Sequence, residues 1–260
     1  MMEIFADLND FMRVALSVVF VLVAIGVSRW QEADLEKDLL IATVRSFIQL
    51  IAIGFALELI FEQDNPLWTI IILAVMIFIA GRTTANRAKS TPQAQAIALL
   101  SIGGGSAITI SVLVGFGVFR FIPNDIIPIG GMVIGNAMTT ATLVITRLTN
   151  DFHDQRGMIE SMLALGATSR EASSRQFRRT LRSAMSPIVD TTKTVGLIKL
   201  PGAMTGMILA GASPLEAVKL QIIVMYMLVG AATFTGLIAA YLTYTRFFTS
   251  AHQITLTTQG

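Results

Sequence analysis

The 260-residue chain contains no cysteine and only two histidines, and only 14% of its residues are charged. Without cysteine it forms neither a disulfide nor a thiolate metal site. The charged fraction lies far below the roughly 25% of soluble domains, while 53% of the residues are apolar, which indicates an integral membrane protein. The chain also lacks the G-x-x-x-x-G-K-[ST] phosphate loop, so we do not expect it to bind ATP in that manner.

The apolar residues form separated runs, each near the roughly 20 helical residues that cross a hydrocarbon core. We expect an all-α polytopic bundle with seven spans, near residues 11–28, 39–61, 67–81, 96–119, 127–148, 195–211 and 218–245. The sixth contains Pro201, which removes a backbone donor and kinks or breaks a helix. The length suits a single transmembrane domain over residues 1–260, with a polar loop at about 150–193.

Basic residues are distributed unevenly between the two sides of this bundle. With the N-terminus outside, the inner loops and the C-terminal segment carry fourteen of the 19 Lys and Arg residues. Positive charge collects on the inner side of membrane proteins, so we expect an N-out, C-in topology with the 150–193 loop inside.

The first part of this loop is predicted to form a helix with an apolar stripe. Met158, Met162 and Leu165 recur at i, i+4 and i+7, which indicates one face of a helix. Gly166 follows and is expected to end it.

A second helix is predicted directly afterwards. Thr168 and Glu171 fit the S/T-x-x-E capping box, so this helix should begin near Ser169 and end at Pro187. One of its faces carries a column of arginines at i, i+3, i+4 and i+7: Arg175, Arg178, Arg179 and Arg182. Three kinds of partner could bind these arginines: anionic lipid, nucleic acid or a cytosolic protein. The stripe and the glycine turn favour a protein over lipid alone, and the lack of nearby stacking aromatics argues against nucleic acid.

Several motifs, in order along the chain, carry a family resemblance. They are Ile127-Pro-Ile-Gly-Gly-Met132, Gly135-Asn-Ala-Met138, Glu160-Ser-Met-Leu-Ala-Leu-Gly-Ala-Thr168, Asp190-Thr-Thr-Lys-Thr-Val-Gly196 and Leu200-Pro-Gly-Ala-Met-Thr-Gly206. Together they resemble the FetB/YbbM (UPF0014) permeases, bacterial relatives of the plant aluminium-sensitivity permeases. The third motif is similar to the cytoplasmic loop that docks ABC-transporter permeases on their ATPase, although Ser161 and Met162 stand where that loop has two alanines.

The resemblance implies an iron-exporting permease subunit in a bacterial plasma (inner) membrane. It implies a homodimer in the membrane with two separate ATPase subunits, which would hold the ATP and magnesium, while this chain binds no cofactor. The resemblance and the loop pattern together make the ATPase-coupling candidates Glu160, Leu163, Leu165, Gly166, Ala167, Thr168, Glu171, Arg175, Arg178 and Arg179.

Polar side chains inside the predicted spans are candidates for the transport path, because a charge at mid-helix costs roughly 2.5–3.5 kcal/mol. Arg45 and Gln49 share one helix face, where Arg45 either snorkels to the inner interface or lines the path. Asn136 is deeper and makes either an interhelical or cross-dimer hydrogen bond or a contact to substrate. Four methionines on the same spans, Met132, Met138, Met204 and Met207, complete the candidates and are equally suited to filling gaps in the packing.

The predicted spans contain few metal ligands of the kind that iron prefers. His153 and His252 both lie in inner polar segments, and iron(II) favours oxygen or imidazole over thioether ligands. The metal-ligating residues therefore stay unknown, and a weak, transient site or a chelated metal would fit.

Asp190 and Lys193 stand at i, i+3 where the loop re-enters the membrane, so we expect an ion pair there. With Pro201 they would transmit movement of the loop to the sixth span. Two other functions stay open. One is an ATPase-independent channel or secondary transporter that uses Arg45, Gln49 and Lys199; the other is a membrane scaffold for cytosolic proteins.

Overall fold

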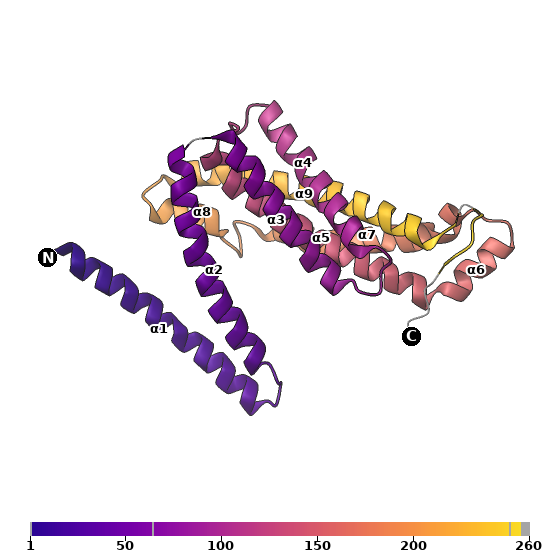
Figure 1. Ribbon diagram of the computed structural model, residues 1–260, viewed down its shortest axis with the longest axis horizontal. Coiled ribbons are helices and arrows are strands. Elements are labelled where there is room, and N and C mark those ends of the chain that lie inside the picture. The colour runs from indigo at the N-terminus through magenta and orange to yellow at the C-terminus, as the bar shows by residue number, and fades with distance from the viewer. Residues whose placement is uncertain (1, 64, 250, 256–260) are drawn as a thin grey trace. The chain divides into compact units, whose positions relative to one another are not determined.

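The computed structural model describes residues 2–63, 65–249 and 251–255, and nearly all of these are helical. The described part separates into two compact units, residues 1–63 and residues 64–260. The first unit holds α1 (Met2–Trp30) and α2 (Glu36–Gln63). The second holds α3 (Pro66–Arg87), α4 (Ala94–Gly115), α5 (Pro123–Asp154), α6 (Arg156–Ala164), α7 (Ser169–Thr194), α8 (Gly202–Leu209) and α9 (Pro214–Phe247), as labelled in Figure 1. The all-helical fold expected from the sequence is confirmed.

In the first unit, a serine organises the turn between the two helices. Ser28 Oγ accepts a hydrogen bond from the Leu35 backbone N–H at 3.1 Å and donates one to Glu36 Oε1 at 3.1 Å. Glu36 and Asp38 lie in the first turn of α2, where carboxylates interact favourably with the helix dipole.

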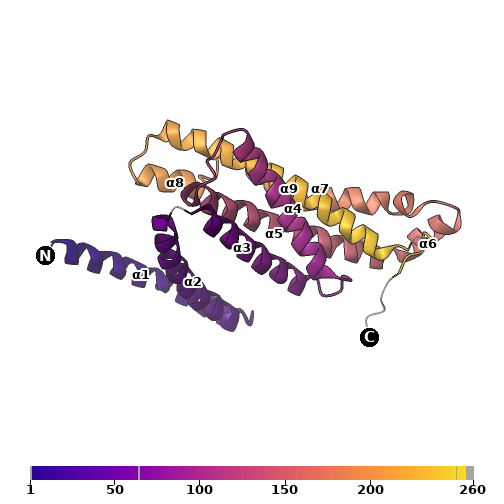
Figure 2. The same ribbon diagram turned by 45° about the horizontal axis from the view of Figure 1, so that its top comes forward.

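In the second unit, α3, α4, α5 and α9 pack side by side into a bundle, with α4 crossing α9 (Figure 2). Helix α5 supplies much of the core, including Ile134, Ala141 and Leu148. The crossing depends on Gly105, because a Cβ atom there would lie 2.8 Å from the Thr235 backbone nitrogen. Small residues of this kind let helices approach closely inside membranes.

Six of the seven expected spans coincide with helices. Among the described residues, five helices are long and apolar enough to cross a membrane, namely α2, α3, α4, α5 and α9, and a shorter apolar stretch covers Leu16–Trp30 of α1. The sixth expected span, 195–211, is wrong as a continuous helix. Residues 195–201 form a turn around Gly196, which has a φ of +83°, and the eight residues of α8 extend only about 12 Å.

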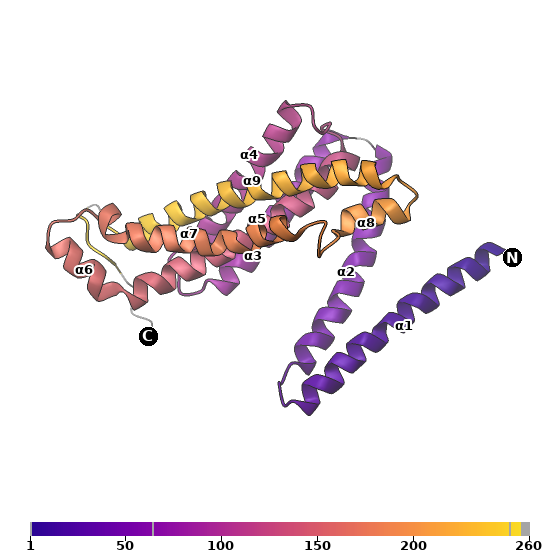
Figure 3. The ribbon, with the colours of Figure 1, turned by 180° about the vertical axis from the view of Figure 1, so that it is seen from behind.

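Helix α7 also differs from the sequence expectation. It was predicted to end at Pro187, yet it continues to Thr194 with the proline inside. Ile188 packs there against Met225 and Ala232 of α9, and this packing holds the helix together beyond the missing donor. The second half of the expected 150–193 loop therefore lies along α9 instead of standing apart from the bundle (Figure 3).

Candidate functional site

The turn between α6 and α7 has a defined geometry. Helix α6 ends in a Schellman motif, in which the Ala167 N–H donates to the Met162 carbonyl at 3.1 Å and the Gly166 N–H to the Leu163 carbonyl at 3.0 Å. Gly166 has a φ of +90°, a conformation that only glycine adopts readily. The predicted helix stop at Gly166 is confirmed. We call α6, residues 165–168 and the first turn of α7 the elbow.

The start of α7 is fixed by the predicted capping box. Thr168 Oγ1 accepts from the Glu171 backbone N–H at 3.3 Å, and Glu171 Oε2 accepts from the Thr168 backbone N–H at 2.8 Å. The backbone N–H bond from Thr168, followed by the bond from its hydroxyl, lowers the pKa of Glu171 below its ordinary value. Both ends of the turn are thus capped, and residues 165–168 are held between two fixed helix termini.

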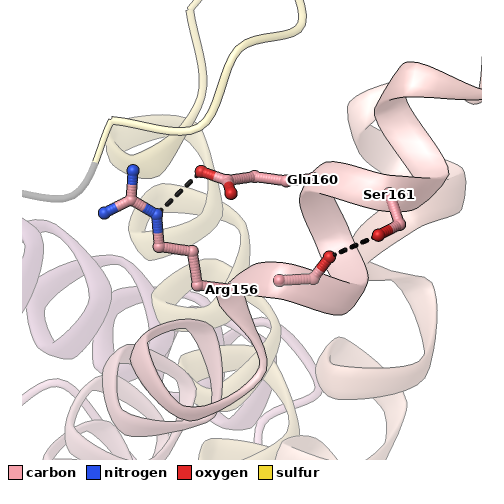
Figure 4. A network of polar contacts seen from close by, with 4 residues as sticks. Arg156, Glu160 and Ser161 are labelled. Carbon is pink, nitrogen blue, oxygen red and sulfur yellow. Dashed lines mark hydrogen bonds and ion pairs between the residues drawn. The ribbon is translucent and has the colours of Figure 1, made fainter.

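Helix α6 presents one face to the bundle and one to solvent. Ile159 is fully buried, and Met162 and Leu163 pack partly against the same core. Leu165, which was predicted on the apolar stripe, instead points outward and is 88% exposed. On the outer face Arg156 Nε donates to Glu160 Oε1 at 2.7 Å, while Ser161 donates to a carbonyl of its own helix (Figure 4). The elbow therefore offers an exposed leucine beside an exposed ion pair.

An aromatic cluster that the sequence reasoning missed supports α6. Phe152 at the end of α5 and Phe247 at the end of α9 are fully buried with ring centroids 5.2 Å apart. Phe248 meets Phe152 at 5.6 Å and forms an antiparallel bridge with Ile254, so residues 251–255 lie back against residues 247–249 as a hairpin. These rings belong to the same core cluster as Ile159, Met162 and Leu163 of α6, so the elbow is joined through that core to the ends of α5 and α9.

His252, in this hairpin, binds the first residue of α7. The Ser169 backbone N–H lies 3.3 Å from His252 Nδ1, and Ser169 Oγ lies 2.7 Å from the same atom. Tyr244 of α9 donates its hydroxyl to Ser169 Oγ at 3.1 Å. Only the cluster of aromatic and polar residues near the end of the sequence could have suggested this role.

The arginine column of α7 lies on one exposed face, as predicted. Arg175, Arg178, Arg179 and Arg182 are all exposed. The opposite face is buried and joined to α5 by hydrogen bonds, from Gln176 Nε2 to Gln155 Oε1 at 3.0 Å and from Thr180 Oγ1 to Asp151 Oδ2 at 3.2 Å. Arg147 of α5 also donates to Ser183 Oγ. The column is thus anchored through α7 to α5.

Hollows lie on both sides of this column. One, about 560 Å³, lies between α7 and α9 and is lined by Arg170, Ser173, Ser174, Phe177, Arg178, Leu181, Tyr241 and Tyr244. The other, about 290 Å³, lies between α5 and α7 and is lined by Arg147, Asn150, Asp151, Arg179, Thr180 and Ser183. Both combine guanidinium groups with hydroxyls.

The candidate path residues are not brought together into one site. Asn136 Nδ2 donates to the Leu228 carbonyl of α9 at 2.9 Å, an interhelical bond within the chain. Met132 and Met138 pack partly buried against different core clusters of the second unit, and Met204 and Met207 lie half-buried on α8. In the first unit Arg45 and Gln49 line one shallow hollow of about 440 Å³ with four aliphatic residues of α2.

The expected ion pair between Asp190 and Lys193 is not among the ion pairs of the described residues, which join Arg120 to Asp125 and Arg156 to Glu160. Asp190 Oδ2 instead accepts a hydrogen bond from Ser186 at 2.8 Å, one turn earlier in α7. Pro201 caps α8, and its carbonyl accepts from the Thr205 hydroxyl at 3.1 Å.

The described residues contain no group of three or more His, Cys, Asp or Glu side chains that could hold a metal ion.

Comparison with known proteins gives a consistent result. Residues 11–248 match the model of an uncharacterised protein family, UPF0014. The chain is 47% identical to the UPF0014 membrane protein STAR2 of rice, over 90% of this chain and 82% of that protein. It is 46% identical to the protein ALUMINUM SENSITIVE 3 of Arabidopsis thaliana, over 95% and 90%. It is 40% identical to the probable iron export permease protein FetB of Escherichia coli, over 94% of both chains. No solved structure matches it. With its apolar helices and this similarity over almost its whole length, the chain belongs to the UPF0014 family of membrane proteins.

Proposed function

We propose that this chain is the permease subunit of an ABC transporter, driven by a separate ATPase that docks on the elbow. The observation that carries the proposal is the elbow itself. It is capped at both helix ends, exposes Leu165 at its turn and stands on buried rings of α5 and α9. A rigid, apolar projection of this kind fits a groove on a partner protein.

The same arrangement would carry movement from the ATPase into the membrane. Helix α5 has 32 residues and α9 has 34, so each extends about 50 Å, well beyond a hydrocarbon core of roughly 30 Å. The elbow shares one core cluster with Phe152 and Phe247, which lie at the ends of these two helices. A displacement of the elbow by ATP-driven closure would therefore tilt both helices without an intervening flexible linker.

The cargo we propose is iron or another metal, exported from the cytoplasm. The support is the relative named as a probable iron export permease, which matches 94% of this chain. The complex would hold two copies of the permease and two ATPase subunits in a plasma (inner) membrane, with the elbow on the cytoplasmic side. ATP and magnesium would bind the ATPase. Arg45 and Gln49 stay candidates for the path, since both lie on one face of α2.

The test is co-purification with an ATPase encoded beside this chain. Replacing Leu165 by glutamate places a charge at the turn and should reduce ATPase recovery by at least about tenfold, since burying an unpaired charge at an interface is costly. Leu209→Glu is the matched control, because Leu209 is 83% exposed and lies on α8, at the other end of the second unit (Figure 3). That variant should keep the ATPase. Equal recovery with both variants, or transport by the permease alone in liposomes, would refute the proposal.

A further inference from the structure

Helix α7 carries a polar stripe along almost its full length, well beyond the elbow. Arg178, Arg182, Ser186, Asp190 and Lys193 follow one another at spacings of four, four, four and three residues, and all are exposed. Such spacing places side chains on one face of a helix. The stripe begins beyond the elbow, so docking of an ATPase on the elbow leaves it unexplained.

The depth of this stripe follows from the packing of α7 on α9. Residues 220–245 of α9 carry no charge, between Lys219 and Arg246. Gly236, within this stretch, lies about 15 Å from the Arg246 end of it. A Cβ atom on Gly236 would lie 3.5 Å from Leu181 Cδ2, so Leu181 is at the same level. Arg182 follows Leu181 directly and lies beside the uncharged part of α9, at the level where Arg147 of α5 meets Ser183, toward the elbow end of the bundle.

Two further contacts place the rest of α7 deeper. Ile188 and Val195 belong to the cluster that contains Met225 and Ala232. Ala232 lies near the middle of the uncharged stretch, and Met225 lies in the half that is farther from Arg246. Ser186, Asp190 and Lys193 therefore lie farther from the elbow, beside the part of α9 that would occupy the hydrocarbon core. In the transport arrangement proposed above, α7 would supply the membrane crossing that the sequence placed at residues 195–211.

The polar face of α7 is not expected to face the lipid hydrocarbon. Charged residues at membrane depth face a bundle interior or a water-filled cavity, because the hydrocarbon does not solvate them. The non-helical backbone at residues 195–201, next along the chain, has the same requirement. The polar face of α7 consequently meets water or another protein surface.

The positive charge on this face determines which ligands it can bind. Arginines dominate it, while Asp190 already accepts a hydrogen bond from Ser186, and none of the ion pairs between described residues neutralises the column. A hollow of about 510 Å³ is lined by Arg178, Arg179, Arg182, Ser183 and Ser186. Guanidinium groups bind carboxylate and phosphate oxygens in paired hydrogen bonds, and they repel a bare metal cation.

We infer that the polar face of α7 lines a water-filled transport passage and binds an oxyanion, a carboxylate or phosphate compound. The oxyanion travels either alone or as an anionic chelate that wraps a metal. The inference rests on the proposed transport function, and it narrows the cargo from a metal cation to an anion. It also explains why the described residues offer no cluster of metal-ligating side chains: the cargo brings the ligands.

Water access is tested with single cysteines, since the chain has none of its own. Ser186→Cys in the permease–ATPase complex should react with a membrane-impermeant thiol reagent, and citrate should slow the reaction. Ile108→Cys is the control, from a helix without charged residues, and should stay unreacted. An unreactive Ser186→Cys overturns the passage, and a disulfide between two copies on oxidation assigns the face to a dimer interface instead.

Cargo class is tested by the stimulation of ATP hydrolysis in the purified complex. The probes are metal-free citrate, ferric citrate, inorganic phosphate and iron(II) alone. We expect at least one oxyanion to stimulate ATP hydrolysis, with the half-maximal concentration raised about tenfold by Arg182→Gln and unchanged by Arg87→Gln.

Stimulation by ferric citrate alone identifies an anionic chelate, and stimulation by citrate or phosphate identifies a free anion. Stimulation by iron(II) alone, equal in wild type and Arg182→Gln, overturns the inference and leaves the proposed ATPase partnership intact. Failure of any ATPase to co-purify refutes that partnership, whatever the labelling shows.

Discussion

Ser169, the first residue of α7, places its Oγ atom 2.7 Å from Nδ1 of His252, a residue 83 positions later in the chain. The hairpin of residues 247–249 and 251–255 thereby holds the start of the helix that carries the arginine column. The elbow is thus secured by three elements: its own caps, the aromatic cluster on α5 and α9, and this histidine.

Replacing His252 by alanine removes the acceptor of the Ser169 bonds. With each bond contributing about 1 kcal/mol, amide hydrogen exchange at the start of α7 should accelerate roughly five- to thirty-fold. Gln253→Ala is the control, because the hydrogen bonds of Gln253 in the hairpin use its backbone atoms. Unchanged exchange in His252→Ala would show that the caps hold the elbow without the hairpin.

Gly166→Val should distort the turn, because valine at a φ of +90° is strained. No neighbouring side chain lies within 4 Å of a Cβ atom there, so the effect comes from the backbone alone. The protein should remain in the membrane and lose most ATPase binding. Gly157→Val is the comparison, since Gly157 lies in α6 with equally open space and should lose much less. Normal ATPase recovery with Gly166→Val would contradict a role for the elbow geometry.

The capping box should weaken in acid. The pKa of Glu171 is lowered in the folded elbow, so its contribution is fully present above the ordinary pKa of a glutamate, about 4.3, and is lost as pH falls through the lowered value. Amide exchange of residues 168–172, corrected for intrinsic rates, should therefore rise at pH below about 4. Glu171→Gln does not titrate and should show no such step.

Asn136→Ala should lower the free energy of unfolding by about 1 kcal/mol, since it removes the hydrogen bond to Leu228 that joins α5 to α9. Thr139→Ala is the control, because the Thr139 hydroxyl donates only to the Gly135 carbonyl of its own helix. Thermal unfolding in detergent measures both. A variant with unchanged stability and altered transport would instead make Asn136 a cargo contact.

Gly105→Val should destabilise the crossing of α4 and α9 by about 1–3 kcal/mol or more, because the new Cβ atom meets the Thr235 backbone. Gly115→Val, at the end of the same helix with open space around it, should be tolerated better. Equal thermal stabilities would mean that the two helices separate easily at this point.

Local chemistry made much of this molecule predictable. The spans over α2, α3, α4, α5 and α9, the stop at Gly166 and the capping box of Thr168 and Glu171 each depend on hydropathy or on residues a few positions apart. Such interactions act within one helix or one turn, so they depend on residues that are close together in the sequence. The amphipathic character of α7 could be read from the sequence for the same reason.

The tertiary structure decided what those elements do. Sequence hydropathy placed the sixth crossing at residues 195–211, because the arginines of α7 made that helix look like an external loop. Packing of Leu181 and Ile188 on α9 instead lays α7 along the bundle, and the helix continues through Pro187. The support of the elbow by Phe152, Phe247 and His252 likewise joins residues far apart in the chain. Contacts of this kind depend on which helices lie side by side, and hydropathy along a single chain contains no record of that arrangement.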